Sequence, residues 1–203
     1  MQQQAGFIFS QVSPALAAAA HRFHRDAAST HPFLKPRDIE KMHSFAEAGE
    51  LFGVRKTEND ELVATCYATR ERHDEFEIGG LVVSDSVRNL GIASILVRFA
   101  IAYVISYEFP RSYAIVANID QRNQDPRNLL AALQFEKVAS IQIADVVKDK
   151  FIFSSAGFRR LSEWFNRFDG FLKDGLTPAT IVAELDYIRA VLASEAAALE
   201  SNP

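Results

Sequence analysis

The sequence predicts an α/β (α+β) domain built around a mixed sheet, followed by a C-terminal helical extension. Helical and strand-like segments alternate between residues 13 and 155, which is typical of a sheet layered against helices. From residue 157 onward, apolar residues recur at spacings of three and four, the period of an amphipathic helix. A chain of 203 residues with 48% apolar side chains is long enough to bury one domain core and an appendage.

Two helices and a hairpin are expected in the first third of the chain. Ser13 followed by Pro14 is typical of a helix start, and an alanine-rich run extends this helix to about Ala28. A second helix is expected over residues 37–48. Residues 51–67 then hold two apolar segments around a polar turn, which predicts a β-hairpin.

The middle of the chain is expected to alternate strands and helices. The expected elements are a strand at 76–83, a polar loop at 84–90, a helix from Gly91 to about 109, a strand at 112–117, a helix at 126–137 with Asp125 as its N-cap, and strands at 138–143 and 151–155. Gly79 and Gly80 interrupt the first of these strands. Glycines inside a strand indicate a bulge or a close approach of the backbone to another group.

The C-terminal extension, residues 157–203, is expected to hold two amphipathic helices beside a domain of residues 1–156. The apolar stripe of the first helix comprises Phe158, Leu161, Trp164, Phe165 and Phe168. The second helix is expected to begin at Thr177-Pro178, with a stripe of Ile181, Leu185, Ile188 and Leu192. Such stripes do not stay exposed on a water-soluble chain, so they pack on the domain or on a second copy as a homodimer.

Charge and composition exclude several classes of protein. The net charge of −4 and the pI near 5.8 offer no general attraction for nucleic acid. The apolar run of residues 91–109 carries Arg98 at its centre, which favours a buried core helix over a membrane span. The N-terminus lacks the pattern of a secretory signal, and the one cysteine, Cys66, fits a reducing compartment as a small core residue, so we expect a cytoplasmic protein.

The loop at residues 88–94 carries the clearest chemical signal. Its sequence, Arg88-Asn89-Leu90-Gly91-Ile92-Ala93-Ser94, lies where a strand gives way to a long apolar helix. Small residues there let the backbone approach a ligand closely, and the unpaired N–H groups of the first helical turn favour an anion such as phosphate. Arg88 adds a positive charge beside that anion.

Together with the preceding strand, Glu77-Ile78-Gly79-Gly80-Leu81-Val82-Val83, this loop resembles the acetyl-CoA site of the GNAT N-acetyltransferase superfamily. The family motif is a strand Glu-Ile-x-x-Leu-x-Val and a loop Gln/Arg-x-x-Gly-x-Gly/Ala that opens a helix. The segment Asn128 to Lys137 is similar to the family's helix along the pantetheine arm. The order of elements agrees from Leu51 to Ser155. The resemblance implies a mostly antiparallel central sheet flanked by helices.

The resemblance also implies which residues bind acetyl-CoA as the cosubstrate. They are Leu81, Val82, Val83, Arg88, Asn89, Leu90, Gly91, Ile92, Ala93, Ser94, Asn118, Asn128 and Phe135. A main-chain N–H at residues 81–83 would stabilise the oxyanion. Phe135 stands where the family often has a tyrosine that protonates the thiolate, a role that water can fill because a thiol has a pKa of about 8.5. Ala139-Ser140 replaces the usual Gly-Phe after that helix.

Glu77 is the candidate catalytic base. On the two-residue period of a strand it shares a face with Leu81 and Val83, so its carboxylate is expected to point toward the same cleft. The alternative is a solvent-exposed edge carboxylate beside Asp74 and Glu75. No metal is implied, and His21 and His24 are interpreted as ordinary surface histidines.

The function that follows is transfer of an acetyl group to a primary amine, by direct attack of the amine on the thioester. The acceptor, a small molecule or a protein, is not specified by the sequence. A different class remains open, in which a catalytically degenerate module binds acyl-CoA or a protein partner in a regulatory role. In the family, segments added around the acetyl-CoA site set acceptor specificity, so the C-terminal helices would also narrow the acceptor cleft.

Overall fold

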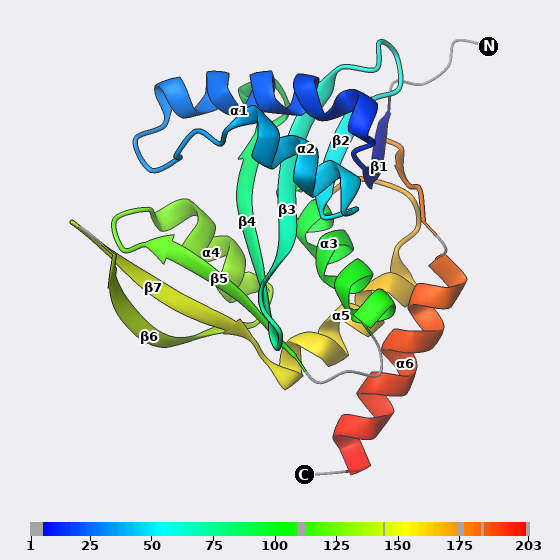
Figure 1. Ribbon diagram of the computed structural model, residues 1–203. Coiled ribbons are helices and arrows are strands. Elements are labelled where there is room, and N and C mark those ends of the chain that lie inside the picture. The colour runs from blue at the N-terminus through cyan, green and yellow to red at the C-terminus, as the bar shows by residue number, and fades with distance from the viewer. Residues whose placement is uncertain (1–5, 109–112, 144, 174–176, 184, 202–203) are drawn as a thin grey trace. The chain divides into compact units, whose positions relative to one another are not determined.

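The fold is a sheet of eight strands flanked by helices, and the computed structural model describes residues 6–108, 113–143, 145–173, 177–183 and 185–201 (Figure 1). In chain order, with η for a short 3-10 helix, the elements are β1 (Phe7–Gln11), η1 (Pro14–Leu16), α1 (Ala17–Thr30), α2 (Ile39–Glu47), β2 (Leu51–Lys56), β3 (Leu62–Arg72), β4 (Glu75–Val83), η2 (Asp85–Val87), α3 (Ile92–Glu108), β5 (Ala114–Asp120), α4 (Gln124–Ala132), β6 (Phe135–Ile143), β7 (Val146–Phe153), α5 (Ser155–Arg167), β8 (Ala179–Ile181) and α6 (Leu185–Ser201). No helix among these residues is long and apolar enough to cross a bilayer.

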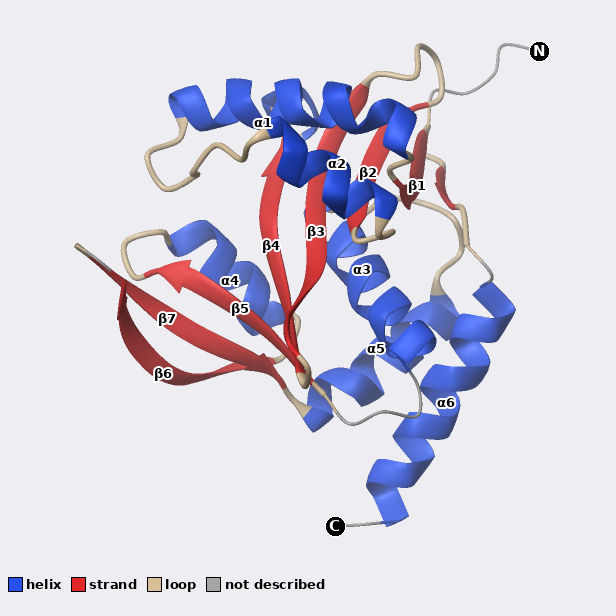
Figure 2. Cartoon of the chain, in the orientation of Figure 1, coloured by secondary structure: helices blue, strands red, loops and turns tan. Residues whose placement is uncertain are grey.

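The sheet is mixed and mostly antiparallel, as expected. Its strand order is β6-β7-β5-β4-β3-β2-β1-β8 (Figure 2). The pairs β1–β2, β2–β3, β5–β7 and β6–β7 are antiparallel, whereas β4–β5 and β1–β8 are parallel. The chain divides into two compact units, of which the first holds Met1–Thr69, Gly80–Ala100 and Asp169–Ala183 and the second holds the rest. Strands β3 and β4 run from one unit into the other.

In the first unit, helices cover both faces of the β1–β2–β3 strands. Helices α1 and α2 pack on one face through a buried cluster that includes Met42, Phe45, Leu51 and Tyr67. Neighbouring strand residues point to opposite faces, so the residue after Leu51, Phe52, points the other way. There its ring meets Phe99 of α3 edge to face, with centroids 5.4 Å apart.

In the second unit, β5 lies between the first residues of β4 and strand β7. Helix α5 packs against α6 through the expected stripe, of which Leu161 and Phe165 are buried. Helix α6 is also tied to the later turns of α3, where the Tyr187 hydroxyl donates to the Ser106 carbonyl over 3.1 Å. The expectation that the aromatic stripe of α5 serves packing is confirmed, and Trp164 contacts Phe165 with ring centroids 4.9 Å apart.

Three expectations about the elements are wrong. Residues 7–11 form strand β1, which the sequence analysis did not expect, although the buried Phe7 and Phe9 alternate with half-buried positions as strand residues do. The helix expected over 126–137 ends earlier, because Gln134 adopts a left-handed φ of +65° and stops it. Phe135 therefore begins strand β6 and does not lie on a helix. The N-cap of α4 is Asn123 and not Asp125.

A further wrong expectation is the helix start at Thr177-Pro178. The Pro178 carbonyl accepts a hydrogen bond from Phe7 N at 2.9 Å, and Ala179 N donates to the Gly170 carbonyl at 2.7 Å. These backbone pairings make residues 179–181 a strand, and α6 begins only at Leu185. Part of the C-terminal extension, Asp169–Ala183, thus belongs to the first compact unit, and the boundary at residue 156 stays a prediction.

Candidate active site

The loop after η2 has a backbone shaped for close approach to a ligand. Asn89 and Gly91 both adopt left-handed φ values, +67° and +82°, immediately before helix α3 begins at Ile92. Alternation of left-handed and ordinary residues turns successive N–H groups toward one side, which makes an anion-binding concavity. The first-turn N–H groups of α3 add to it, because they have no partner within the helix.

Charged and polar side chains around this loop are partly engaged. Arg88 pairs with Asp85 of η2 at 2.7 Å, and both side chains are exposed to water. The Ser94 hydroxyl and carbonyl accept hydrogen bonds from Arg98, the latter over 3.3 Å, and burial lowers the pKa of Arg98. Ile92 is buried, whereas Ala93 and Leu90 are half-buried.

A segment from the C-terminal part of the chain lies directly against this loop. Lys173 N donates to the Leu90 carbonyl over 3.3 Å. A Cβ placed on Gly91 would lie 3.3 Å from the Lys173 Cβ, so a larger residue at position 91 meets both strained backbone and a crowded neighbour. The sequence analysis had no signal for this contact, because the two residues are far apart in the chain.

Strand β4 is irregular where two glycines were expected to mark a bulge. Gly80 has a φ of +58°, in the left-handed region, and a Cβ at this position would lie 2.5 Å from Tyr67 Cε1. Only glycine fits both the backbone angle and the space. After this break, Val82 is buried while Leu81 and Val83 are half-buried.

Glu77 and Asn118 are brought together by the strand pairing. Glu77 lies opposite Val116 in the parallel β4–β5 ladder, and Asn118 follows two residues later on the same face of β5. Asn118 Nδ2 donates to Glu77 Oε2 over 3.3 Å, and both side chains are half-buried. Glu77 is therefore not a fully exposed edge carboxylate.

The neighbouring acidic residue of β4 has a different partner. Glu75, two residues before Glu77 on the same strand face, forms an ion pair with Lys150 Nζ of β7 at 2.5 Å. The two glutamates thus have different partners in these contacts: Glu75 pairs with the Lys150 ammonium, and Glu77 accepts a hydrogen bond from the Asn118 amide.

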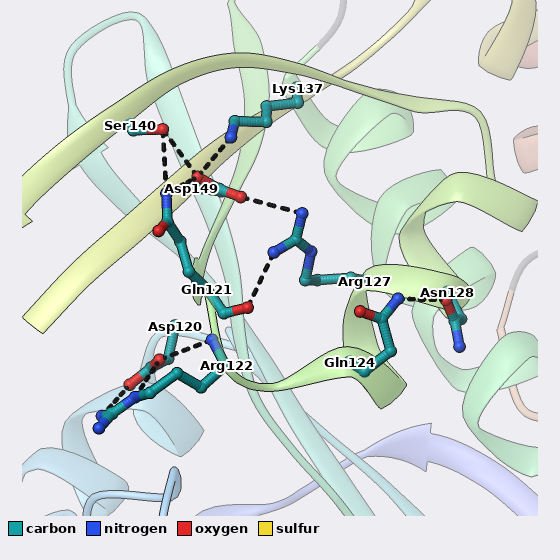
Figure 3. Close-up of polar contacts among 9 residues, drawn as sticks. All are labelled: Asp120, Gln121, Arg122, Gln124, Arg127, Asn128, Lys137, Ser140 and Asp149. Atoms are coloured by element: carbon teal, nitrogen blue, oxygen red, sulfur yellow. Dashed lines mark hydrogen bonds and ion pairs between the residues drawn. The ribbon is translucent and has the colours of Figure 1, made fainter.

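Of the remaining sequence-expected residues, Asn128 lies on α4 (Figure 3), and Phe135 is the first residue of β6. Asn128 is exposed on α4, and its Oδ1 accepts from Gln124 Nε2 at 2.7 Å. Phe135 is buried, and its ring lies 5.1 Å from that of Phe153, centroid to centroid.

Helix α4 is fixed by a buried carboxylate that the sequence analysis missed. Asp149 of β7 is fully buried, pairs with Lys137 Nζ at 2.7 Å and Arg127 Nη2 at 3.2 Å, and accepts from Ser140 and Gln121 (Figure 3). The Lys137 ammonium, ahead of the other donors, holds the Asp149 pKa down at about 2. This network ties the start of α4 to the β6–β7 hairpin and uses the positive charge of Arg127 within the protein.

A second missed cluster surrounds Gly80 in the first unit. His24 of α1 is only 2% exposed, so the expectation of a surface histidine is wrong at this position. Tyr67 of β3 is buried as well, and its hydroxyl accepts from Arg37 Nη2 at 2.5 Å. By contrast, the expectation for Cys66 is confirmed, since this thiol is buried and burial raises its pKa.

Comparison with known proteins agrees with this architecture. The sequence profile of the acetyltransferase (GNAT) family matches residues 8–132, which is more than half of the chain. The chain therefore belongs to the GNAT acetyltransferase family, and acetyl-CoA is its cosubstrate. No curated protein matches the sequence closely enough to count as a relative.

Solved structures of the same fold are similar to this chain at low sequence identity. An acetyltransferase (GNAT family) from Bacillus anthracis gives a TM-score of 0.57 at 14% identity, covering 74% of this chain and 95% of its own. Arabidopsis thaliana NAA60 in complex with acetyl-CoA gives a TM-score of 0.59 at 17% identity, and the match covers 72% of this chain and 98% of the NAA60 chain. A ribosomal-protein-alanine N-acetyltransferase from Brucella melitensis gives a TM-score of 0.56 at 15% identity, and the match covers 71% of this chain and 97% of the other chain.

Proposed function

We propose that the protein transfers the acetyl group of acetyl-CoA to a primary amine by direct attack, with Glu77 as the general base. The observation that carries this proposal is the contact between Glu77 and Asn118, which orients a half-buried carboxylate on the motif strand. A carboxylate held in this way keeps its capacity to accept a proton, directly or through one water.

The reaction proceeds in one transfer step. The neutral amine nitrogen attacks the thioester carbonyl carbon, and a tetrahedral oxyanion forms, which a main-chain N–H in the segment Leu81 to Val83 stabilises. The carbon–sulfur bond then breaks, the thiolate of CoA leaves, and the ammonium proton passes to Glu77. Because Phe135 has no hydroxyl group, the thiolate takes its proton from water, which a thiol pKa of about 8.5 permits.

Acetyl-CoA is proposed to lie across the start of α3. Its pyrophosphate would be bound by the N–H groups of the loop and first helical turn, with Arg88 alongside, and its pantetheine arm by Asn118 and Asn128. The residues assigned to acetyl-CoA are thus those implied by the family resemblance. The two left-handed φ values in this loop support the assignment.

The amine acceptor is supported by a structural neighbour as well as by the family. The Brucella melitensis neighbour is named as an N-acetyltransferase of a ribosomal-protein alanine, whose acceptor is therefore an amine. A cytoplasmic location, expected from the sequence, is part of the proposal.

A thiol-release assay over a panel of amines and alcohols tests the proposal, with mass spectrometry of the product. We expect CoA release that depends on a primary amine, and an N-acetylated product. Release with alcohols alone, or acetyl-CoA binding with no release for any amine in the panel, would overturn it. The second result would point to the degenerate binding module.

A further inference from the structure

Two side chains lie against Gly80, where β4 departs from an extended strand, and a third side chain contacts one of them. They come from α1, the α1–α2 connection and β3, and all belong to the first compact unit. A Cβ placed on Gly80 would lie 2.5 Å from the Tyr67 ring and 3.6 Å from His24 Nε2. Arg37 contacts Tyr67 in turn: it donates to the Tyr67 hydroxyl, and its guanidinium carbon lies 5.2 Å from the centre of the Tyr67 ring.

Arg37 is a half-buried cation with no carboxylate partner in the part of the chain that the structure describes. Within the described residues its guanidinium donates to the neutral Tyr67 hydroxyl and forms no ion pair with a carboxylate. A guanidinium has five N–H donors in a fixed fork that matches a carboxylate, so most of its binding capacity is unused here. Partial burial of an uncompensated charge is costly, which favours an anionic ligand at this point.

His24 supplies a second, independent sign of a ligand. Both of its ring nitrogens are buried, and neither has a hydrogen-bond partner among the residues that the structure describes. Burial, followed by the nearby charges of Arg37 and His21, lowers the His24 pKa to about 4. The imidazole is therefore neutral at physiological pH, and it offers one acceptor and one donor to a polar group placed beside Gly80.

We propose that Arg37, Tyr67 and His24 form the acceptor subsite, and that the acceptor is an amine that also carries a carboxylate, bound by the Arg37 guanidinium. This proposal rests on the proposed function, because it names the class of amine that receives the acetyl group. Gly80 immediately precedes Leu81, the start of the segment assigned to the oxyanion. The cluster therefore surrounds the strand segment at which transfer is proposed to occur.

The positive charge of Arg37 also separates acceptor classes. An amino acid presents a carboxylate to the guanidinium, whereas a polyamine presents further cations, which Arg37 repels. The N-terminus of a peptide presents an uncharged amide at the same position and leaves the guanidinium unpaired. A free amino acid is therefore favoured over both of the other amines, and the amide of that amino acid is the matched comparison.

The test compares acids with amides in a binding experiment that needs no turnover. N-acetylglycine, N-acetylleucine and N-acetylphenylalanine, with the corresponding amides, are titrated calorimetrically into the protein saturated with CoA. We expect at least one acid to bind about tenfold more tightly than its amide, the discrimination that one charge-assisted, bidentate contact supplies. In R37A the ratio of acid affinity to amide affinity falls to about one. In R37K part of this preference remains, because lysine keeps the positive charge but lacks the bidentate guanidinium.

Arg25 provides the matched control. It is an exposed arginine of α1 that pairs with Asp26, so R25A removes the same charge away from Gly80 and leaves the ratio unchanged. Acetyl-CoA affinity, measured for every variant, shows that each remains folded. Equal binding of acids and amides by the unaltered protein, binding of neither, or an unchanged ratio in R37A would overturn the carboxylate subsite. Absence of turnover with every amine would instead overturn the proposed function, and the binding ratio is measured in either case.

Discussion

Asn118 Nδ2 lies 3.3 Å from Glu77 Oε2, and the two side chains project from neighbouring parallel strands. The hydrogen bond orients the carboxylate with a neutral donor, whereas a cation in the same place would hold the proton-accepting form too tightly for a general base. The ion pair of Glu75 with Lys150 shows the other arrangement on the same strand. The pair of glutamates therefore supplies both a test and its control.

Replacement of Glu77 by Gln is expected to lower kcat about 100-fold, because loss of a general base typically costs 10² to 10⁴ in rate. The KM for acetyl-CoA should change little. E75Q is the matched control, since it alters the same residue type two positions away, and its kcat should stay within a few fold of the unaltered protein. Steady-state kinetics with a saturating amine measure both, and equal kcat for E77Q and the unaltered protein would make Glu77 a structural carboxylate.

Gly91→Ala is expected to weaken acetyl-CoA binding by about tenfold or more. The left-handed φ of +82° costs an alanine about 1 kcal/mol, and the added Cβ would press on Lys173, so the loop shifts from its ligand-binding shape. Gly49→Ala carries the same backbone cost at a φ of +71°, after α2 and away from the loop. Calorimetry should show weaker acetyl-CoA binding for G91A alone. Equal losses of acetyl-CoA affinity in G91A and G49A would show that the loop at Gly91 has no specific role in phosphate binding.

The elements that the sequence predicted well are those set by local pattern. The hairpin, helix α3 and the glycine break in β4 follow from residue period and from glycine itself, and each is found close to its expected place. The half-buried position of Glu77 is compatible with the alternation expected along its strand, whereas its role as a base stays a prediction. The end of α4 could not be predicted from the sequence, because Gln134 adopts a left-handed φ at a position that usually holds glycine or asparagine.

The polar clusters could not be read because they join distant residues. Asp149 looks like an ordinary charged residue in a charged segment, and only the strand pairing brings it to Lys137 and Arg127. His24 and Arg37 lie on the α1 side of the chain, and their proximity to Gly80 depends on how α1 packs on the sheet. A single sequence contains no local signal for such long-range contacts.

Protonation of His24 is expected to make stability depend on pH. Its pKa is lowered to about 4 in the folded protein, from an unfolded value near 6.5. The unfolded chain therefore binds a proton that the folded chain does not bind, so the free energy of unfolding falls by about 3 kcal/mol as the pH drops from 6.5 to 4. Above pH 6.5 the contribution is fully present.

Chemical denaturation across that pH range, with His24→Phe as the comparison, measures this effect. The variant should lose the slope between pH 6.5 and 4 and keep the losses below pH 4. Those losses arise from Asp120 and Asp149, whose pKa values are lowered to about 2. Parallel curves for both proteins across the whole range would show that His24 does not carry this dependence.

Truncation after Ser154 is expected to destabilise the protein strongly. The removed residues include the buried side chains of Leu161, Phe165, Leu172 and Ile188, and deletion of one large core side chain typically costs about 2 to 5 kcal/mol. We expect loss of soluble protein, or, where a homodimer forms through this region, loss of the dimer by light scattering. A soluble truncated monomer with unchanged acetyl-CoA affinity would show the region to be dispensable.

The parallel pairing of β1 with β8 has a consequence for when the protein folds during synthesis. Phe7 lies opposite Ala179, so the outer neighbour of β1 is made only after residues 12–178 have been translated. Until then, the open edge of β1 exposes unpaired backbone groups to other nascent chains. The first compact unit therefore completes its sheet only after residue 181 has been made, and its assembly includes the closure of a long loop between β1 and β8.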